Sequence, residues 1–168
     1  MKVEKSLSKT THPFEPFIDK SSKVLILGSF PSIKSFEDNF YYAHPQNQFW
    51  KLLSGVWDEK TPQTIDEKKA FLQKHHIALW DVIHSCKRKN SLDSNLKEIE
   101  PNDIETLLKN YPNIKKICFT SKTALKIYEK NFNIDIKTFY LPSPSPAYRT
   151  ISFEEKLKTY KKVLKSMV

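Results

Sequence analysis

The sequence is poor in cysteine and in long apolar runs, and each shortage excludes a class of protein. The 168 residues include two cysteines, Cys86 and Cys118, too few for a disulfide framework or a zinc site. No apolar stretch approaches the roughly 20 residues that a membrane-spanning helix needs. The N-terminus, MKVEKSLSKT, lacks the hydrophobic region of a signal peptide. We therefore expect a soluble cytoplasmic protein with reduced thiols, no metal site built from cysteines and no membrane partner.

Acidic residues are also outnumbered, which leaves the chain strongly basic. Against 19 Asp and Glu stand 28 Lys and Arg, so the formal net charge is +9. A basic surface attracts polyanions, of which DNA and RNA are the commonest large ones. An anionic membrane, or lysines that are merely solvated, would explain the same excess. The charge alone therefore leaves the partner open.

The length and the apolar content fit one domain with a substantial core. We expect residues 1–11 to be a flexible N-terminal segment and residues 12–168 to be a single domain. Short β-rich apolar runs predict strands at Lys23–Leu27, Ile77–Ile83, Lys116–Phe119 and Lys137–Leu141. Helices are expected between and after them, with start signals at Thr64/Glu67, Asn102/Glu105, Ser121 and Ser152/Glu155.

Alternation of strands and helices predicts an α/β fold with a parallel sheet covered on both faces. In such folds the binding site lies beyond the carboxyl ends of the strands. Four polar or proline-rich segments stand at those ends: GSFPS, DVIHSCKRKNS, FTSK and LPSPSPAY. Their convergence predicts a site before any motif is considered.

The segment GSFPS follows the first predicted strand. Gly28 allows a sharp turn and close approach of a ligand to the backbone, and Pro31 fixes the next turn. Exposed backbone N–H groups there can hold an anion or a base edge. The loop is not of the nucleotide-hydrolase type, because the second glycine and the Lys-Ser/Thr pair are missing. An ordinary strand-to-loop turn is the alternative.

The segment YYAHPQNQFW places four aromatic residues, a histidine and an asparagine close together. Aromatic faces in an open loop suit base stacking. The amide of Asn47 offers both donors and an acceptor, so it can read a base or hold a water. His44 is either an acid or a structural histidine bonded to the backbone. Phe49 and Trp50 are predicted to belong to the core of the following helix.

The segment LPSPSPAY forms a stiff, extended loop that can enter a groove at little entropic cost. Ser143 and Ser145 can donate to phosphates, and Arg149 follows closely. A solvated proline-rich turn is the alternative. Further basic side chains, at Lys87, Arg88 and Lys89, stand in a segment that is either a binding loop or a plain connection.

Four segments resemble, in this order, the uracil-DNA glycosylase superfamily, and within it the hypoxanthine-DNA glycosylase branch: GSFPS, YYAHPQNQFW, ALWDVIHSCKRKNSLDSN and LPSPSPAY. GSFPS is similar to the first superfamily motif and LPSPSPAY to the second, the loop that inserts into DNA. ALWDVIHSCKRKNSLDSN is similar to a signature of the hypoxanthine branch. The resemblance implies a three-layer αβα sandwich with a short, mainly parallel four-stranded sheet. It also implies a monomeric enzyme that flips a damaged base out of DNA and excises it without a cofactor.

The resemblance assigns roles by position. Asn47 falls at the key catalytic asparagine of the branch, and Tyr42 falls where an aromatic ring stacks on the flipped base. The implied base pocket comprises Gly28, Ser29, Phe30, Pro31, Tyr42 and His44. The implied DNA contacts are Ser143, Pro144, Ser145 and Pro146, with Arg149, Lys87, Arg88 and Lys89 holding the backbone.

The sequence departs from the superfamily pattern at several positions. Phe30 stands where uracil-excising relatives carry an Asp or Asn that positions the attacking water. FTSK stands where the branch more often has an Asn-Gly pair, while Leu141 and Ser145 replace a histidine and a leucine wedge. Hypoxanthine is therefore the expected base, with uracil or ethenoadenine as alternatives. A non-catalytic nucleic-acid binder and a hydrolase of free nucleosides also remain open.

Overall fold

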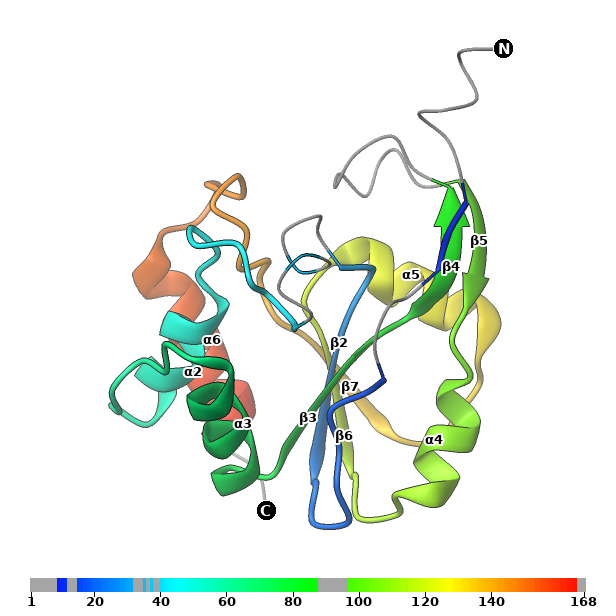
Figure 1. Cartoon of the computed structure of the whole chain (residues 1–168), viewed down its shortest axis with the longest axis horizontal. Helices are drawn as coiled ribbons and strands as arrows, with labels where there is room; N and C mark the ends of the chain where they lie inside the picture. The colour runs from blue at the N-terminus through cyan, green and yellow to red at the C-terminus, as the bar shows by residue number, and fades with distance from the viewer. Residues whose placement is uncertain are drawn as a thin grey trace.

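The computed structural model describes residues 9–11, 15–31, 35, 37, 40–87 and 97–165. Its centre is a four-stranded parallel sheet with the strand order β3-β2-β6-β7 (Figure 1). The strands are β2 (Val24–Gly28), β3 (Ile77–Asp81), β6 (Lys116–Phe119) and β7 (Lys137–Tyr140). The first and last residues of each strand lie within two positions of the predicted bounds. The four expected strands are therefore confirmed.

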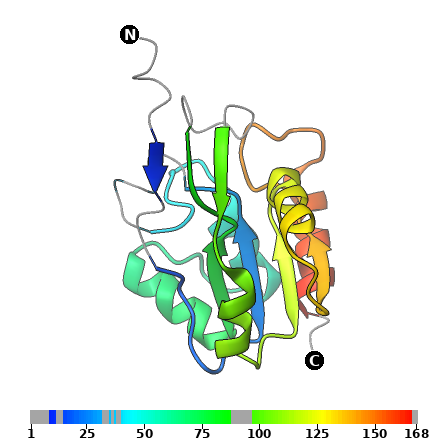
Figure 2. The same ribbon diagram turned by 90° about the vertical axis from the view of Figure 1, so that its right-hand side faces the viewer.

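Helices cover both faces of this sheet and make three layers. They are α2 (Phe49–Val56), α3 (Ile65–Lys74), α4 (Ile104–Asn110), α5 (Lys122–Asn131) and α6 (Phe153–Lys165). Figure 1 shows α2, α3 and α6 on one side of the sheet and α4 and α5 on the other, and Figure 2 looks onto the second side. The predicted αβα arrangement with a mainly parallel sheet is confirmed.

The central strand β2 shows why the chain takes this arrangement. All of its five residues are buried, as expected for a parallel strand with helices on both faces. Val24 and Ile26 pack with the side chains of α2, α3 and α6, while Leu25 and Leu27 pack with those of α4 and α5. The period-two alternation thus divides the core into two halves. Cys118 lies in the first half.

A second, antiparallel sheet of order β1-β4-β5 joins the first at Val82. Its strands are β1 (Lys9–Thr11), β4 (Ile83–Lys87) and β5 (Lys97–Pro101). The prediction of one strand through Ile83 followed by a loop was wrong here. The chain changes sheet because the buried Asn102 side chain donates to the carbonyls of Asp81 and Ile83, at 2.8 and 3.2 Å. These bonds satisfy the backbone where the first ladder ends.

Three of the four predicted helix starts are confirmed. Thr64 forms a complete capping box with Glu67 at the start of α3. The Ser121 hydroxyl accepts from the backbone at the start of α5, and Ser152 and Glu155 cap α6 reciprocally. The fourth start is shifted by one residue: Asp103 caps α4, because Asn102 is engaged at the junction of the sheets.

The N-terminal region contains a short strand. We expected residues 1–11 to be flexible, yet Lys9–Thr11 form β1, paired with β4. Residues 1–8 lie outside the described residues, and the division into segment and domain stays a prediction. None of the helices in the described part of the chain has the length and apolar composition needed to span a membrane.

Candidate functional site

The carboxyl ends of the parallel strands meet along one edge of the sheet. In register, Gly28 at the end of β2 lies beside Asp81 at the end of β3. Thr120 follows β6 directly on the other side of β2. The structure therefore brings together strand ends that are far apart in the sequence, as the parallel topology predicts.

Gly28 occupies a crowded point of this edge. A Cβ atom there would lie 2.6 Å from Asp81 Oδ1, 3.1 Å from the Tyr42 hydroxyl and 3.5 Å from Thr120 Oγ1. The first distance is shorter than any real Cβ contact, so only glycine fits. Its φ is not positive, so close approach, and not the predicted sharp turn, requires glycine here.

The groups around Gly28 are polar and mostly buried. Asp81 is only 4% exposed, and the Tyr42 hydroxyl lies 2.9 Å from Thr120 Oγ1. A carboxylate and two hydroxyls thus surround one backbone position at the edge of the sheet. Such a cluster of buried polar groups is expensive for folding and is typical of a functional site.

Tyr42 is held in an unusual conformation. Its φ is 52°, in the left-handed region that bulky residues rarely adopt. Its ring stacks on that of Phe49, with centroids 3.8 Å apart and an interplanar angle of 17°. Stacking on a flipped base would therefore use the ring face opposite Phe49. Phe49 and Trp50 are buried in the core, as predicted.

Asn47 lies at the start of α2, and only part of its amide is engaged. The side-chain Oδ1 of Asn47 accepts from the backbone N–H of Phe49 at 2.9 Å. The backbone N–H of Asn47 donates to the carbonyl of His44 at 2.9 Å. Since a backbone N–H can only donate, the oxygen of the amide must face Phe49. The Nδ2 group makes no hydrogen bond with any described residue. Asn47 therefore carries a preoriented donor.

His44 is an exposed turn residue. Its Nδ1 accepts from the backbone N–H of Gln46 at 3.1 Å, so its proton lies on Nε2 when the ring is neutral. This hydrogen bond fits the second of the two interpretations of His44, a structural histidine bonded to the backbone.

The residues of the GSFPS segment partly hold the local structure together. The carbonyls of Gly28 and Ser29 accept from the N–H groups of Val82 and Ile83, at 2.8 and 3.0 Å. Phe30 packs with Ile83 and Cys86 in a small apolar cluster. Pro31 is buried. Phe30 thus offers no polar group at this edge, in line with the sequence departure noted above.

The loop after β7, residues 141–148, is here called the proline loop. Ser143 and Ser145 shape it from within: their hydroxyls accept from the N–H groups of Ser145 and Ala147, at 3.2 and 3.1 Å. Pro144 is buried, Pro146 is partly exposed, and the exposed Arg149 donates to the Pro146 carbonyl at 3.2 Å.

The proline loop is joined directly to residues 47–48, here called the Asn47 segment. The backbone N–H of Gln48 donates to the Pro144 carbonyl at 2.8 Å. Figure 1 shows the orange loop after β7 beside the cyan segment that leads into α2. Two motifs separated by almost a hundred positions in the sequence therefore form one surface. The side chain of Lys87 and the residues Arg88 and Lys89 lie outside the described residues, so their role stays a prediction.

Sequence reasoning missed Asp81, Thr120 and Lys156. Asp81 and Thr120 stand in strand-end segments that were recognised, but nothing in the sequence shows that strand register directs both toward Gly28. Lys156 is 1% exposed and donates to Gln48 Oε1 at 2.8 Å. Its spacing of four from Tyr160 places it on the buried face of α6, a signal that could have identified it.

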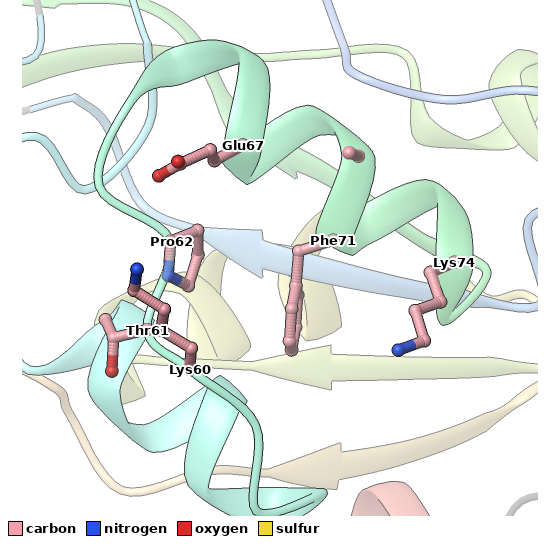
Figure 3. Close-up of a pocket in the computed structure, with 7 residues that line it drawn as sticks. Lys60, Thr61, Pro62, Glu67, Phe71 and Lys74 are labelled. Carbon is pink, nitrogen blue, oxygen red and sulfur yellow. The ribbon is translucent and has the colours of Figure 1, made fainter.

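A hollow elsewhere on the molecule is not part of this site. Figure 3 shows it between residues 60–62 and α3. Its lining residues are Lys60, Thr61, Pro62, Glu67, Ala70, Phe71 and Lys74, none of which belongs to a strand end. Glu67 is occupied by the capping box of α3. Among the described residues, no group of His, Cys, Asp and Glu could hold a metal ion.

Comparison with known proteins decides the family. The model of the uracil DNA glycosylase superfamily matches residues 15–167. The chain belongs to this superfamily. The resemblance predicted from the four motifs is thus confirmed, and the match includes every residue that surrounds Gly28.

Curated and solved relatives agree with this membership. The chain is 35% identical over 140 residues to a hypoxanthine DNA glycosylase of Methanosarcina acetivorans, covering 83% of this chain and 89% of the relative. It is 37% identical over 113 residues to a protein of the same name from Methanosarcina barkeri, covering 66% and 71%. A solution NMR structure of a candidate uracil DNA glycosylase from Methanosarcina acetivorans superposes with a TM-score of 0.81 at 31% identity, over 94% of this chain and 97% of that one.

Proposed function

We propose that this superfamily member is a DNA glycosylase that flips hypoxanthine, the deaminated base of deoxyinosine, out of DNA and hydrolyses its N-glycosidic bond. The observation that carries the proposal is the junction of the Gly28 edge, the Asn47 segment and the proline loop in one surface. The names of the two curated relatives support hypoxanthine as the base. We further infer that the protein acts as a cytoplasmic monomer.

DNA binding follows from charge and from the proline loop. The formal net charge of +9 attracts the phosphate backbone. Flipping a base costs a few kcal/mol, and it costs least for a poorly paired base such as hypoxanthine. The proline loop is already fixed by its internal hydroxyl bonds and by the Gln48–Pro144 bond. Little ordering entropy is therefore lost when it enters the gap that the flipped base leaves.

Asn47 contributes as a donor to the leaving base. Cleavage of the glycosidic bond builds negative charge on the base, and preoriented donors stabilise charge where it develops. The Oδ1 atom of Asn47 is held by Phe49, which directs Nδ2 as the donor. An amide cannot act as a strong general base, since it does not titrate usefully. The structure thus favours base contact over water activation as the role of Asn47.

Asp81 supplies the carboxylate that Phe30 does not. Cleavage also builds positive charge on the sugar, which a buried carboxylate stabilises, and the same group can orient the attacking water. Asp81 Oδ1 lies at the Gly28 edge, and the Asn102 side chain holds the backbone of this residue by donating to the Asp81 carbonyl. We infer that Asp81 takes over the task that relatives assign to the third position of the first motif.

The test uses labelled duplexes that carry a single deoxyinosine, uracil or ethenoadenine. We expect abasic product from deoxyinosine, and slower or no release of uracil. Asn47→Ala should lower the single-turnover rate about 10²-fold or more, in line with the loss of one preoriented donor. Asn47→Asp is the matched control for folding, because it keeps the acceptor for the Phe49 N–H while removing the Nδ2 donor.

The outcomes separate the alternatives. Equal losses in Asn47→Asp and Asn47→Ala, with unchanged melting temperatures, assign the donor role. Full activity in both variants would remove Asn47 from the mechanism. Salt-sensitive DNA binding without abasic product would identify a non-catalytic binder. Turnover of free inosine without dependence on DNA would identify a nucleoside hydrolase.

A further inference from the structure

Lys156 is a lysine in the middle of α6 that lies inside the protein. Its side chain is only 1% exposed. Its Nζ donates to Gln48 Oε1 at 2.8 Å and to the Ser145 carbonyl at 3.3 Å. The ammonium also lies over the ring of Tyr148, 5.3 Å from its centroid, within the limit of about 6 Å for a cation–π contact. Burial lowers the pKa of Lys156.

Within the described part of the chain, no acidic residue compensates this charge. Among the described residues, the partners of Lys156 are an amide oxygen, a carbonyl and an aromatic face, and no carboxylate forms an ion pair with it. Lysine is almost never fully buried unless it is paired, because removing an ammonium from water is costly. A methionine would fill the same space without that cost. Burying this charge therefore lowers the free energy of unfolding, so Lys156 must have a role other than stabilising the fold.

The contacts of Lys156 indicate the role of its charge, because they join two segments of the candidate site. Gln48 follows Asn47 directly and starts α2, while Ser145 lies at the centre of the proline loop. The same two segments are joined by the bond from the Gln48 N–H to Pro144. Tyr160, one turn after Lys156, donates to the Pro142 carbonyl at 2.8 Å. Two side chains of α6 thus hold the proline loop, and one of them, Lys156, also reaches the Asn47 segment.

We propose that Lys156 is a positioning residue that holds the proline loop and the Asn47 segment in register for DNA. In the free protein no acidic residue of the described part of the chain compensates its positive charge next to Ser145, and a DNA backbone phosphate bound at the proline loop compensates it. This inference rests on the proposed function, since it assumes that the loop meets the DNA backbone. It predicts a variant that is well folded and weak in binding.

The experiment compares Lys156→Met with Lys158→Met. Both changes lie in α6 and remove one lysine charge, but Lys158 is exposed. Single-turnover cleavage of the deoxyinosine duplex gives the half-saturating enzyme concentration and the maximal rate separately. We expect Lys156→Met to raise the half-saturating concentration about tenfold or more relative to Lys158→Met, as for a buried charge–phosphate interaction. The maximal rate should change less, and the melting temperature should not fall.

A second readout needs no catalysis. The backbone N–H groups of Gln48 and Tyr148 bond to Pro144 and Ser145 in the loop. If Lys156 holds the two segments together, amide hydrogen exchange at these positions should be about tenfold faster or more in Lys156→Met than in Lys158→Met.

The two readouts separate the failure of this inference from failure of the proposed function. Absence of cleavage by the unaltered protein would defeat the proposed function, and exchange would then test the role of Lys156 in joining the loops. Half-saturation and exchange equal to those of Lys158→Met would overturn the inference. So would a defect that disappears when each variant is assayed at the same interval below its own melting temperature, because that result assigns a purely structural role.

Discussion

The Asp81 carboxylate and the missing side chain of Gly28 define the site at the scale of single residues. The carboxylate supplies the charge of the site, and the missing side chain supplies the space for it. The carboxylate oxygen occupies the space next to the position where a Cβ of residue 28 would project. The site is therefore sensitive to small changes in shape as well as in charge. Two substitutions separate these requirements.

Asp81→Asn keeps the shape of the side chain and removes its charge. If the carboxylate stabilises the sugar cation or orients water, the single-turnover rate on deoxyinosine should fall about 10²–10³-fold. Binding of the duplex should change little, because Asp81 is buried and its proposed contacts are the sugar and the attacking water, not the phosphates. Single-turnover kinetics at saturating enzyme measures the effect. A rate within threefold of the unaltered protein would exclude this role for Asp81.

Gly28→Ala adds one methyl group at the crowded edge. The new Cβ would lie 2.6 Å from Asp81 Oδ1, so the carboxylate or the strand has to move. We expect a loss of about 1–3 kcal/mol in the free energy of unfolding, as for other overpacked sites. Activity should fall well beyond the loss expected from stability, which denaturant titration and cleavage assays measure on the same samples.

Gly55→Ala is the matched control for that change. Its Cβ would meet Leu157 Cδ1 at 2.9 Å, which is the far end of a flexible side chain outside the site. It should keep full activity on deoxyinosine at a temperature where it is folded. If Gly28→Ala also kept full activity, the edge around Gly28 would not be the catalytic centre.

At the scale of elements, the junction between the two sheets positions the site. The side chain of Asn102 donates to the carbonyls on both sides of Val82. Asn102→Ala would leave two buried carbonyl groups without these partners and cost about 1–3 kcal/mol of stability. Because one of these carbonyls belongs to Asp81, cleavage of deoxyinosine should fall as well. Thermal unfolding and cleavage measured together test this coupling.

Thr64→Ala supplies the comparison for that prediction. It removes the capping box of α3, which lies outside the site, and should cost about 1 kcal/mol. Its activity, assayed at the same interval below its melting temperature, should equal that of the unaltered protein. Equal activity losses in Thr64→Ala and Asn102→Ala would show that stability alone explains both.

Elements were easier to predict than contacts, for physical reasons. The central strands and most helix starts depend on local apolar runs and capping residues, which the sequence displays directly. The strands β4 and β5 were missed because their segment is polar, and because the chain leaves the first sheet where the Asn102 side chain, about twenty positions further along, bonds to the backbone. The polar groups around Gly28 come from three separate segments, so only strand register brings them together. Lys156 was missed because a lysine is normally read as exposed.

At the scale of the whole molecule, the excess of positive charge predicts how DNA binding depends on salt. The logarithm of the binding constant should fall linearly with the logarithm of salt concentration, with a slope of about −0.9 for each phosphate neutralised. Between about 50 and 200 mM salt, two or more phosphate contacts weaken binding about tenfold or more. Fluorescence anisotropy with a deoxyinosine duplex measures this slope. Binding that is insensitive to salt would contradict a phosphate-based interface.

The measurement that tests the central claim most directly is cleavage of a labelled duplex with one deoxyinosine by the unaltered protein. Matched duplexes carrying uracil or only normal bases are the controls. The account predicts an abasic site at the deoxyinosine position, formed faster than at uracil and absent from the normal duplex. No abasic product from the deoxyinosine duplex, by a folded protein that binds it, would contradict the account.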